Sequence, residues 1–144
     1  MLKGAVLGGG AELALAFDVR FAHPCTRFSF SQLKMGLSCG WGGFARLAHF
    51  VGRSCALQWV LEAADLTTDE LAASGLAIPL LHADEETCLA AWRAKWCSQD
   101  LNSLRSVITV LKGEGGRDQE RAIFARLWKS SAHQRAMDMF LNKR

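Results

Sequence analysis

Three successive glycines, Gly8, Gly9 and Gly10, are followed after one alanine by Glu12, and this stretch has the residue types of an active-site edge. Glycine lets the backbone adopt positive φ angles and lets another molecule approach the main chain closely. The first N–H groups of a helix lack intrahelical acceptors, and the helix dipole adds partial positive charge, so an oxyanion formed there would be stabilised. We therefore expect these amides to bind a negatively charged oxygen. The alternative is a tight strand-to-helix turn that binds nothing.

Glu12 lies in the first turn of a helix that is otherwise apolar. Burial would raise the pKa of this carboxyl towards a range useful for proton transfer, whereas the helix N-terminus would lower it. The alternative is a surface glutamate that only stabilises the helix dipole. A nucleotide site is not favoured, because the glycines lack both the Lys-Ser/Thr of a P-loop and the third glycine of a dinucleotide fingerprint.

The elements around this turn can be predicted from the pattern of apolar residues. We expect residues 3–7 to be the tail of a core strand and residues 10–17 to be a helix, which must be buried because it is apolar almost all round. Further strands are expected at 19–22 and 27–30. Residues 31–43 are expected to be irregular.

The later part of the chain is predicted to be mainly helical. Thr67 and Glu70 form a capping box, and residues 76–81, which include Pro79, are expected to be a short edge strand. The composition shift predicts a core region, residues 1–83, and a helical region, residues 84–144. Helices are expected over 43–50, 54–62, 68–74, 84–97, 100–112, 117–129 and 131–143.

The order of the motifs resembles the crotonase superfamily, which has the enoyl-CoA hydratase/isomerase fold. The similarity runs from Gly4 to about Leu81 and lies in Gly8–Ala14, Asp18-x-Arg20, Phe28-x-Phe30, Gly36-Leu37, Gly40–Gly43, Arg46-Leu47, Gly52 and Gly75-Leu76. It implies an α/β fold: the C-terminal part of the crotonase spiral of short strands and helices, followed by a helical C-terminal region. Family members have a long segment before the triple glycine, so the resemblance also implies that the front of the fold is missing.

The resemblance assigns expected roles to several residues. Gly9 matches the glycine whose backbone N–H binds the thioester oxygen, and Glu12 matches one of two catalytic carboxylates and is expected to be the proton donor. Gly8 lies in the same turn, and Gly40 and Trp41 lie in a loop that lines the acyl pocket, so these three are expected to bind substrate. For Trp41 the alternative is a core aromatic. The implied chemistry is stabilisation of an enolate on an acyl-CoA thioester, with CoA as part of the substrate and no separate cofactor.

Gln32 departs from the family pattern, because the second catalytic glutamate falls at this position. Hydration of a double bond needs one group to activate water and another to protonate the α-carbon, and an amide does neither near neutral pH. Decarboxylation of a malonyl-type thioester demands less, and the segment from Phe30 to Gly43 resembles the ethylmalonyl/methylmalonyl-CoA decarboxylase branch. Hydratase or isomerase, decarboxylase, and a non-catalytic fragment with an assembly role therefore remain open.

The composition excludes several other classes of function. The 144 residues are half hydrophobic and 22% charged, which is typical of a globular domain, and a net charge of +3 with scattered basic residues does not favour nucleic-acid binding. No apolar run reaches the about 18 residues that span a bilayer. The resemblance implies a homo-oligomer, a trimer or hexamer, built by the C-terminal helices.

The cysteines and histidines do not form a recognisable metal or nucleophile motif. Five cysteines without CxxC spacing are expected to be reduced thiols, as in the cytoplasm or an organelle matrix. The nearest pair, His23 and Cys25, lacks the second pair that a zinc site needs, so no metal is expected. The histidines lack a Ser or Cys partner in any nucleophile motif, which argues against a hydrolase triad; they are His23, His49, His82 and His133.

Overall fold

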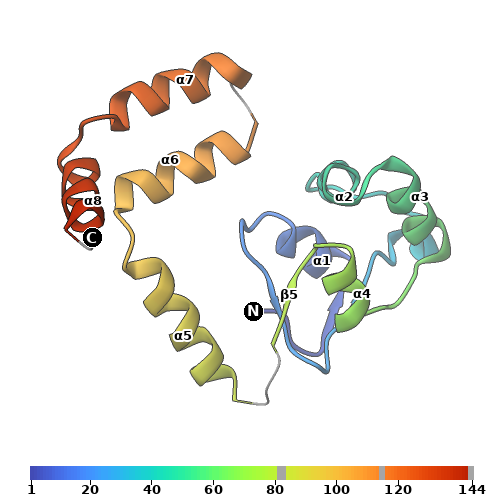
Figure 1. The fold of residues 1–144 in the computed structure, drawn as a ribbon. Coiled ribbons are helices and arrows are strands. Elements are labelled where there is room, and N and C mark those ends of the chain that lie inside the picture. Colours follow the sequence, from blue (N-terminus) through green and yellow to red (C-terminus); the bar gives the residue numbers. More distant parts are fainter. Residues whose placement is uncertain (81–83, 114–115, 143–144) are drawn as a thin grey trace. The chain divides into compact units, whose positions relative to one another are not determined.

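The computed structural model describes residues 1–80, 84–113 and 116–142 and divides the chain into two compact units, Met1–Leu89 and Ala90–Arg144 (Figure 1). The division lies within helix α5 (Glu85–Cys97). The predicted boundary after residue 83 falls at residues 81–83, outside the described part, and it stays a prediction.

Two small sheets form the frame of the first unit. Strand β1 (Ala5–Leu7) pairs in parallel with β3 (Arg27–Ser29), which pairs antiparallel with β4 (Leu66–Thr67). In the second sheet β2 (Phe21–Ala22) pairs in parallel with β5 (Ile78–Pro79). The strands expected near residues 3–7, 19–22, 27–30 and 76–81 are therefore present, whereas the two-residue strand β4 gave no periodic signal in the sequence.

The register of β1 and β3 brings two distant segments to one edge of the sheet. Leu7 lies opposite Ser29, and the Gly8 N–H donates to the Ser29 carbonyl at 2.9 Å. Parallel strands in register end at the same edge. The segments that follow them, helix α1 (Gly9–Ala14) and the 3₁₀ helix η1 (Gln32–Met35), therefore begin side by side.

Helix α1 corrects one expectation. It ends at Ala14 rather than at residue 17, and the Leu13 and Phe17 side chains are 56% and 59% exposed. Ala11 and Leu15 are buried in the core, and α1 packs on β1 and on helix α2 (Gly43–Val51). An apolar helix is buried only on the side where a partner packs, so the prediction of burial all round is wrong.

The core of the first unit lies between its strands and its helices. Phe28 and Phe30 pack edge to face with ring centroids 5.6 Å apart, and both are almost completely buried. The predicted capping box is confirmed at helix α4 (Thr68–Ala73), where the Thr67 N–H donates to Glu70 Oε2 at 2.7 Å. Helix α3 (Arg53–Glu62) and its neighbours close the core with Leu47, Ala56, Val60, Leu71 and Leu76.

The second unit is helical, as expected. It contains the rest of α5 and helices α6 (Leu101–Leu111), α7 (Gly116–Leu127) and α8 (Ser131–Leu141). Asp100 is the N-cap of α6, at the start of the helix expected over 100–112, and its Oδ2 accepts the Ser103 N–H at 2.9 Å. Within the described ranges, no helix is both long and apolar enough to cross a membrane.

Candidate active site

The edge where β1 and β3 end brings Glu12 and Gln32 into direct contact. Gln32 Nε2 donates to Glu12 Oε1 at 3.1 Å, and the two residues are only 4% and 5% exposed. Glu12 lies in the first turn of α1, and Gln32 is the first residue of η1. The structure thus places both predicted catalytic positions in one buried cluster.

A loop closes over the other oxygen of Glu12. The Trp41 N–H donates to Glu12 Oε2 at 2.7 Å, and the Gly43 N–H donates to the same oxygen at 3.2 Å. A Cβ atom on Gly43 would lie 2.4 Å from Glu12 Cγ, so only glycine allows this approach. Gly42 makes the turn into α2 with a φ of 76°, in the left-handed region that favours glycine. The glycines at the start of α2 are therefore needed to bring two amides to the carboxylate.

These hydrogen bonds decide the ionisation of Glu12. Burial raises the pKa of this carboxyl, but hydrogen bonds from Trp41, Gly43, Cys39 and Gln32 together outweigh it, and the pKa lies below its ordinary value of 4.5. The sequence left open whether burial or stabilisation of the charge would prevail. The structure shows that stabilisation of the charge prevails, because four hydrogen-bond donors face the carboxylate. Glu12 is therefore ionised near neutral pH.

Cys39 is the member of the cluster that sequence reasoning missed. Gln32 Nε2 lies 3.3 Å from Cys39 Sγ, and the thiol is hydrogen-bonded to Glu12. Burial, followed by the hydrogen bond and the charge of Glu12, raises the pKa of the Cys39 thiol to about 12. Cys39 therefore carries a proton near neutral pH. It stands in an irregular loop with no motif spacing, so nothing in the sequence indicated this position.

The Gln32 amide has one buried oxygen for which the described residues supply no hydrogen-bond donor. Gln32 Oε1 is inaccessible to solvent and has no hydrogen-bond partner in the described part of the chain. A buried acceptor without a donor is unfavourable by about 1–3 kcal/mol. A ligand or a water that donates a hydrogen bond to this oxygen would remove that penalty.

The glycine turn and Trp41 border the same cluster. Gly8 has a φ of 52°, and Gly9 begins α1, where the first N–H groups have no intrahelical acceptor. The Trp41 ring lies against Gly9, because a Cβ there would be 3.1 Å from Trp41 Cζ3. Trp41 is 65% exposed, so the alternative of a core aromatic is wrong. Gly40 is exposed with open space around its Cα, and its substrate-binding role stays a prediction.

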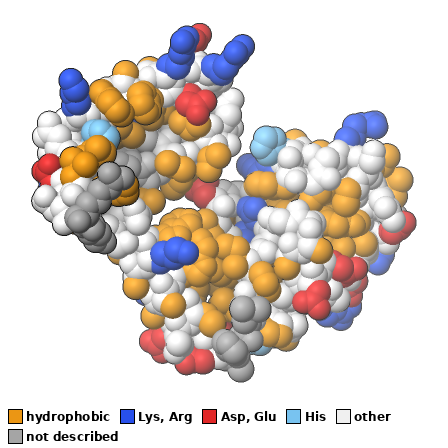
Figure 2. Space-filling view, viewed as in Figure 1, with side chains coloured by type: hydrophobic (Ala, Val, Ile, Leu, Met, Phe, Trp, Pro, Cys, Tyr) orange, Lys and Arg blue, Asp and Glu red, His pale blue; other side chains and the backbone are white. Residues whose placement is uncertain are grey.

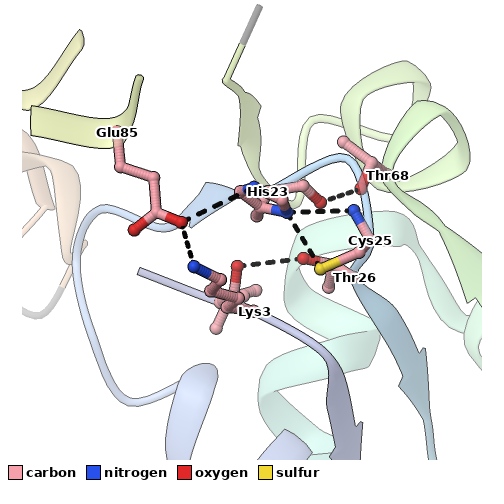
Figure 3. Close-up of polar contacts among 7 residues, drawn as sticks. Lys3, His23, Cys25, Thr26, Thr68 and Glu85 are labelled. Atoms are coloured by element: carbon pink, nitrogen blue, oxygen red, sulfur yellow. Dashed lines mark hydrogen bonds and ion pairs between the residues drawn. The ribbon is translucent and has the colours of Figure 1, made fainter. Parts of the chain in front are cut away.

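The remaining candidate groups lie outside this cluster, and one of them corrects the sequence analysis. His23 Nδ1 lies 2.9 Å from Cys25 Sγ, so this histidine does have a cysteine partner, which the turn between them provides (Figure 3). His82 lies outside the described residues. In the described ranges no three His, Cys, Asp or Glu side chains are grouped so that they could hold a metal ion.

Comparisons with known proteins show the family to which the chain belongs. The enoyl-CoA hydratase/isomerase family matches residues 1–144. An ethylmalonyl-CoA decarboxylase from Gallus gallus is 32% identical over 147 aligned residues, which cover 95% of this chain and 49% of the relative. A short-chain-enoyl-CoA hydratase from Clostridium acetobutylicum is 33% identical over 84 residues, 58% of this chain and 32% of that protein.

A solved structure has the same fold. An enoyl-CoA hydratase subunit from Geobacillus kaustophilus superposes with a TM-score of 0.87 at 27% identity, covering 99% of this chain and 58% of that one. The crotonase-type α/β fold expected from the sequence is thereby confirmed. The chain spans about half the length of the curated decarboxylases that it matches. On the match over residues 1–144 and this structural similarity, the chain belongs to the enoyl-CoA hydratase/isomerase family.

Proposed function

We propose that this protein stabilises the enolate of an acyl-CoA thioester, and that decarboxylation of a malonyl-type thioester is the reaction its site supports best. One observation carries the proposal: the side chain that faces Glu12 in the buried cluster is the amide of Gln32, at a hydrogen-bond distance of 3.1 Å. Among the residues that the structure describes, this cluster therefore contains one carboxylate rather than a pair. The ethylmalonyl-CoA decarboxylases among its relatives support the same reaction.

Hydration of an enoyl thioester is the runner-up reaction within the same family. It requires a base for water and an acid for the α-carbon. Ionised Glu12 supplies a base, but Gln32 cannot act as the paired acid, because an amide does not exchange a proton near neutral pH, so hydration would need the Cys39 thiol as its acid. A short-chain-enoyl-CoA hydratase is also among the relatives, so the products must distinguish the two reactions.

In the proposed reaction the bond between the α-carbon and the substrate carboxylate breaks, and carbon dioxide leaves. The electron pair remains on the thioester as an enolate, whose oxygen accepts the Gly9 N–H at the start of α1. A proton then adds to the α-carbon. Glu12 does not carry that proton, since its lowered pKa keeps it ionised. We assign the proton to Cys39, the protonated thiol in the cluster, which regains it from solvent.

Calorimetric titration tests whether the chain binds such a thioester. We expect a short acyl-CoA to bind more tightly than the matching alkyl thioether of CoA, which lacks the carbonyl oxygen, by about tenfold or more, because a preorganised donor contributes about 2.7–4 kcal/mol to oxyanion binding and less to a neutral carbonyl. CoA alone is the control for contacts outside the acyl group. Equal affinity for thioester and thioether would contradict a role for the Gly9 amide, and no binding by folded protein would contradict the acyl-CoA proposal.

A second candidate function, assembly without catalysis, is favoured by the surface of the helical unit. Phe124, Trp128, Met139 and Phe140 are each more than half exposed, and Figure 2 shows hydrophobic side chains on the surface over α7 and α8. Exposed apolar groups of this size indicate an interface. The predicted trimer or hexamer and a location in the cytoplasm or an organelle matrix remain proposals. They are supported by this surface and by the five free cysteines respectively.

A further inference from the structure

A second group of reactive side chains lies in the first unit, apart from the Glu12 cluster (Figure 3). Cys25 and His23 stand in the turn between β2 and β3, and Glu85 is the first residue of α5. His23 Nδ1 is 2.9 Å from Cys25 Sγ, and His23 Nε2 is 3.5 Å from Glu85 Oε1. A thiol, an imidazole within hydrogen-bond distance of it and a carboxylate at ion-pair distance from the imidazole therefore follow one another, which resembles the arrangement of an activated nucleophile.

The hydrogen bonds define which nitrogen of His23 faces the thiol as a base. The Cys25 backbone N–H donates to His23 Nδ1 at 3.1 Å, so Nδ1 is an acceptor and the ring proton of neutral His23 is on Nε2. Glu85 Oε1 lies 3.5 Å from Nε2, at ion-pair distance. The single Nδ1 lone pair is therefore shared between the backbone N–H and the S–H group of Cys25, and Glu85 stabilises the imidazolium that forms when the thiol proton is transferred.

Neighbouring side chains hold the turn in place. Thr68 Oγ1 donates to the His23 carbonyl at 2.6 Å, and Thr26 Oγ1 donates to the Leu2 carbonyl at 2.9 Å. Both threonines are buried. Lys3 forms an ion pair with Glu85 and interacts electrostatically with Cys25. The thiol thus has a fixed base on one side and a positive charge nearby.

The thiol of Cys25 is more accessible to solvent than the His23 and Glu85 side chains, as a nucleophile that must meet a dissolved disulfide requires. The His23 and Glu85 side chains are 18% and 24% exposed, whereas Cys25 is open to solvent. Cys97 is also exposed, and its thiol has no hydrogen-bond partner in the described ranges. The same chain therefore offers one exposed thiol beside a base and one without a base for comparison.

We propose that Cys25 is a reactive thiol, activated by His23 and oriented through Glu85, that undergoes reversible exchange with small anionic disulfides. His23 Nδ1 takes the Cys25 proton, and the thiolate attacks one sulfur of the disulfide. The disulfide bond breaks as a new bond forms to Cys25, and the leaving thiolate takes the proton from His23. Cys25 is oxidised, one sulfur of the disulfide is reduced, and a second thiol reverses the reaction. Lys3 favours an anionic disulfide.

The test uses the intact protein with oxidised glutathione and follows mixed disulfide on the Cys25 and Cys97 peptides by mass spectrometry. We expect Cys25 to react faster than Cys97 by about tenfold or more, as base assistance of a proton transfer allows. His23→Gln and Glu85→Gln should each lower the Cys25 rate towards that of Cys97 and leave Cys97 unchanged. His49→Gln and Glu86→Gln are matched controls on exposed positions and should change neither rate.

The pH dependence separates activation from a structural effect of these substitutions. The rate at Cys97, which has no base beside it, should rise steeply with pH, because only the thiolate attacks a disulfide. The Cys25 rate should rise less steeply, because His23 rather than solvent accepts its proton, and His23→Gln should restore the steep slope. Equal rates with parallel pH profiles at the two cysteines would overturn the proposal, as would a folded His23→Gln protein in which Cys25 reacts at the unchanged rate.

Discussion

Gly43→Ala is expected to abolish acyl-CoA binding and to destabilise the first unit, although it adds only one methyl group. The new Cβ would lie 2.4 Å from Glu12 Cγ, 3.1 Å from Glu12 Cβ and 3.2 Å from Cys39 Sγ. The backbone at residue 43 and the Glu12 side chain must then move apart. The Gly43 and Trp41 amides thereby lose their hydrogen bonds to the Glu12 carboxylate. Overpacking of this kind costs about 1–3 kcal/mol. Chemical denaturation measures the change in the free energy of unfolding, and calorimetry measures the binding.

Gly40→Ala is the matched control in the same loop. No atom lies within 4 Å of a Cβ at Gly40, and its φ is not in the left-handed region. Its stability should stay close to that of the unmodified protein. If Gly43→Ala were as stable as Gly40→Ala, the close packing of Glu12 against the start of α2 would be wrong.

Glu12→Gln should destabilise the protein near neutral pH and leave stability little changed in acid. The folded-state pKa of Glu12 lies below its ordinary value of 4.5, since the hydrogen bonds to the carboxylate outweigh burial. A group with a lowered pKa contributes stability above its unfolded-state pKa, and the contribution is lost as pH falls through the folded-state pKa. Hydrogen bonds to a charged group are worth about 1.5–3 kcal/mol, so the loss near neutral pH should be of about that size.

Urea denaturation over a range of pH checks this expectation. The two stability curves should be separated above the unfolded-state pKa of Glu12 and converge below its folded-state pKa. Glu62→Gln, at an exposed glutamate in the same unit, is the matched control and should follow the unmodified protein throughout. A Glu12→Gln protein with the same pH profile as the unmodified protein would show that the carboxylate is not stabilised by its four donors.

The elements and caps of this fold could be predicted because their signals are local. The capping box at Thr67 and Glu70 lies within four residues, and the amphipathic pattern that predicts α2 is contained in the helix itself. The extent of burial was harder to predict. Phe17 is apolar but 59% exposed, because exposure depends on what packs against α1 and not on the residue itself.

The candidate site could be predicted only in part. Glu12 and Gln32 are 20 residues apart, and only the family resemblance paired them before the parallel register of β1 and β3 placed them in contact. Cys39 gave no signal, because its role depends on how an irregular loop closes. The same holds for His23, since its partner Glu85 lies 62 residues further along the chain and only the fold brings it near.

Turnover of two substrates by the purified chain tests the central claim most directly. A malonyl-type CoA thioester and a short enoyl-CoA should be supplied separately, with mass spectrometry of the acyl products and detection of carbon dioxide. The site predicts carbon dioxide release from the first substrate, lost in Gly43→Ala, with no hydration of the second. Hydration of the enoyl thioester without release of carbon dioxide, or no turnover of either by folded protein, would contradict decarboxylation by this site.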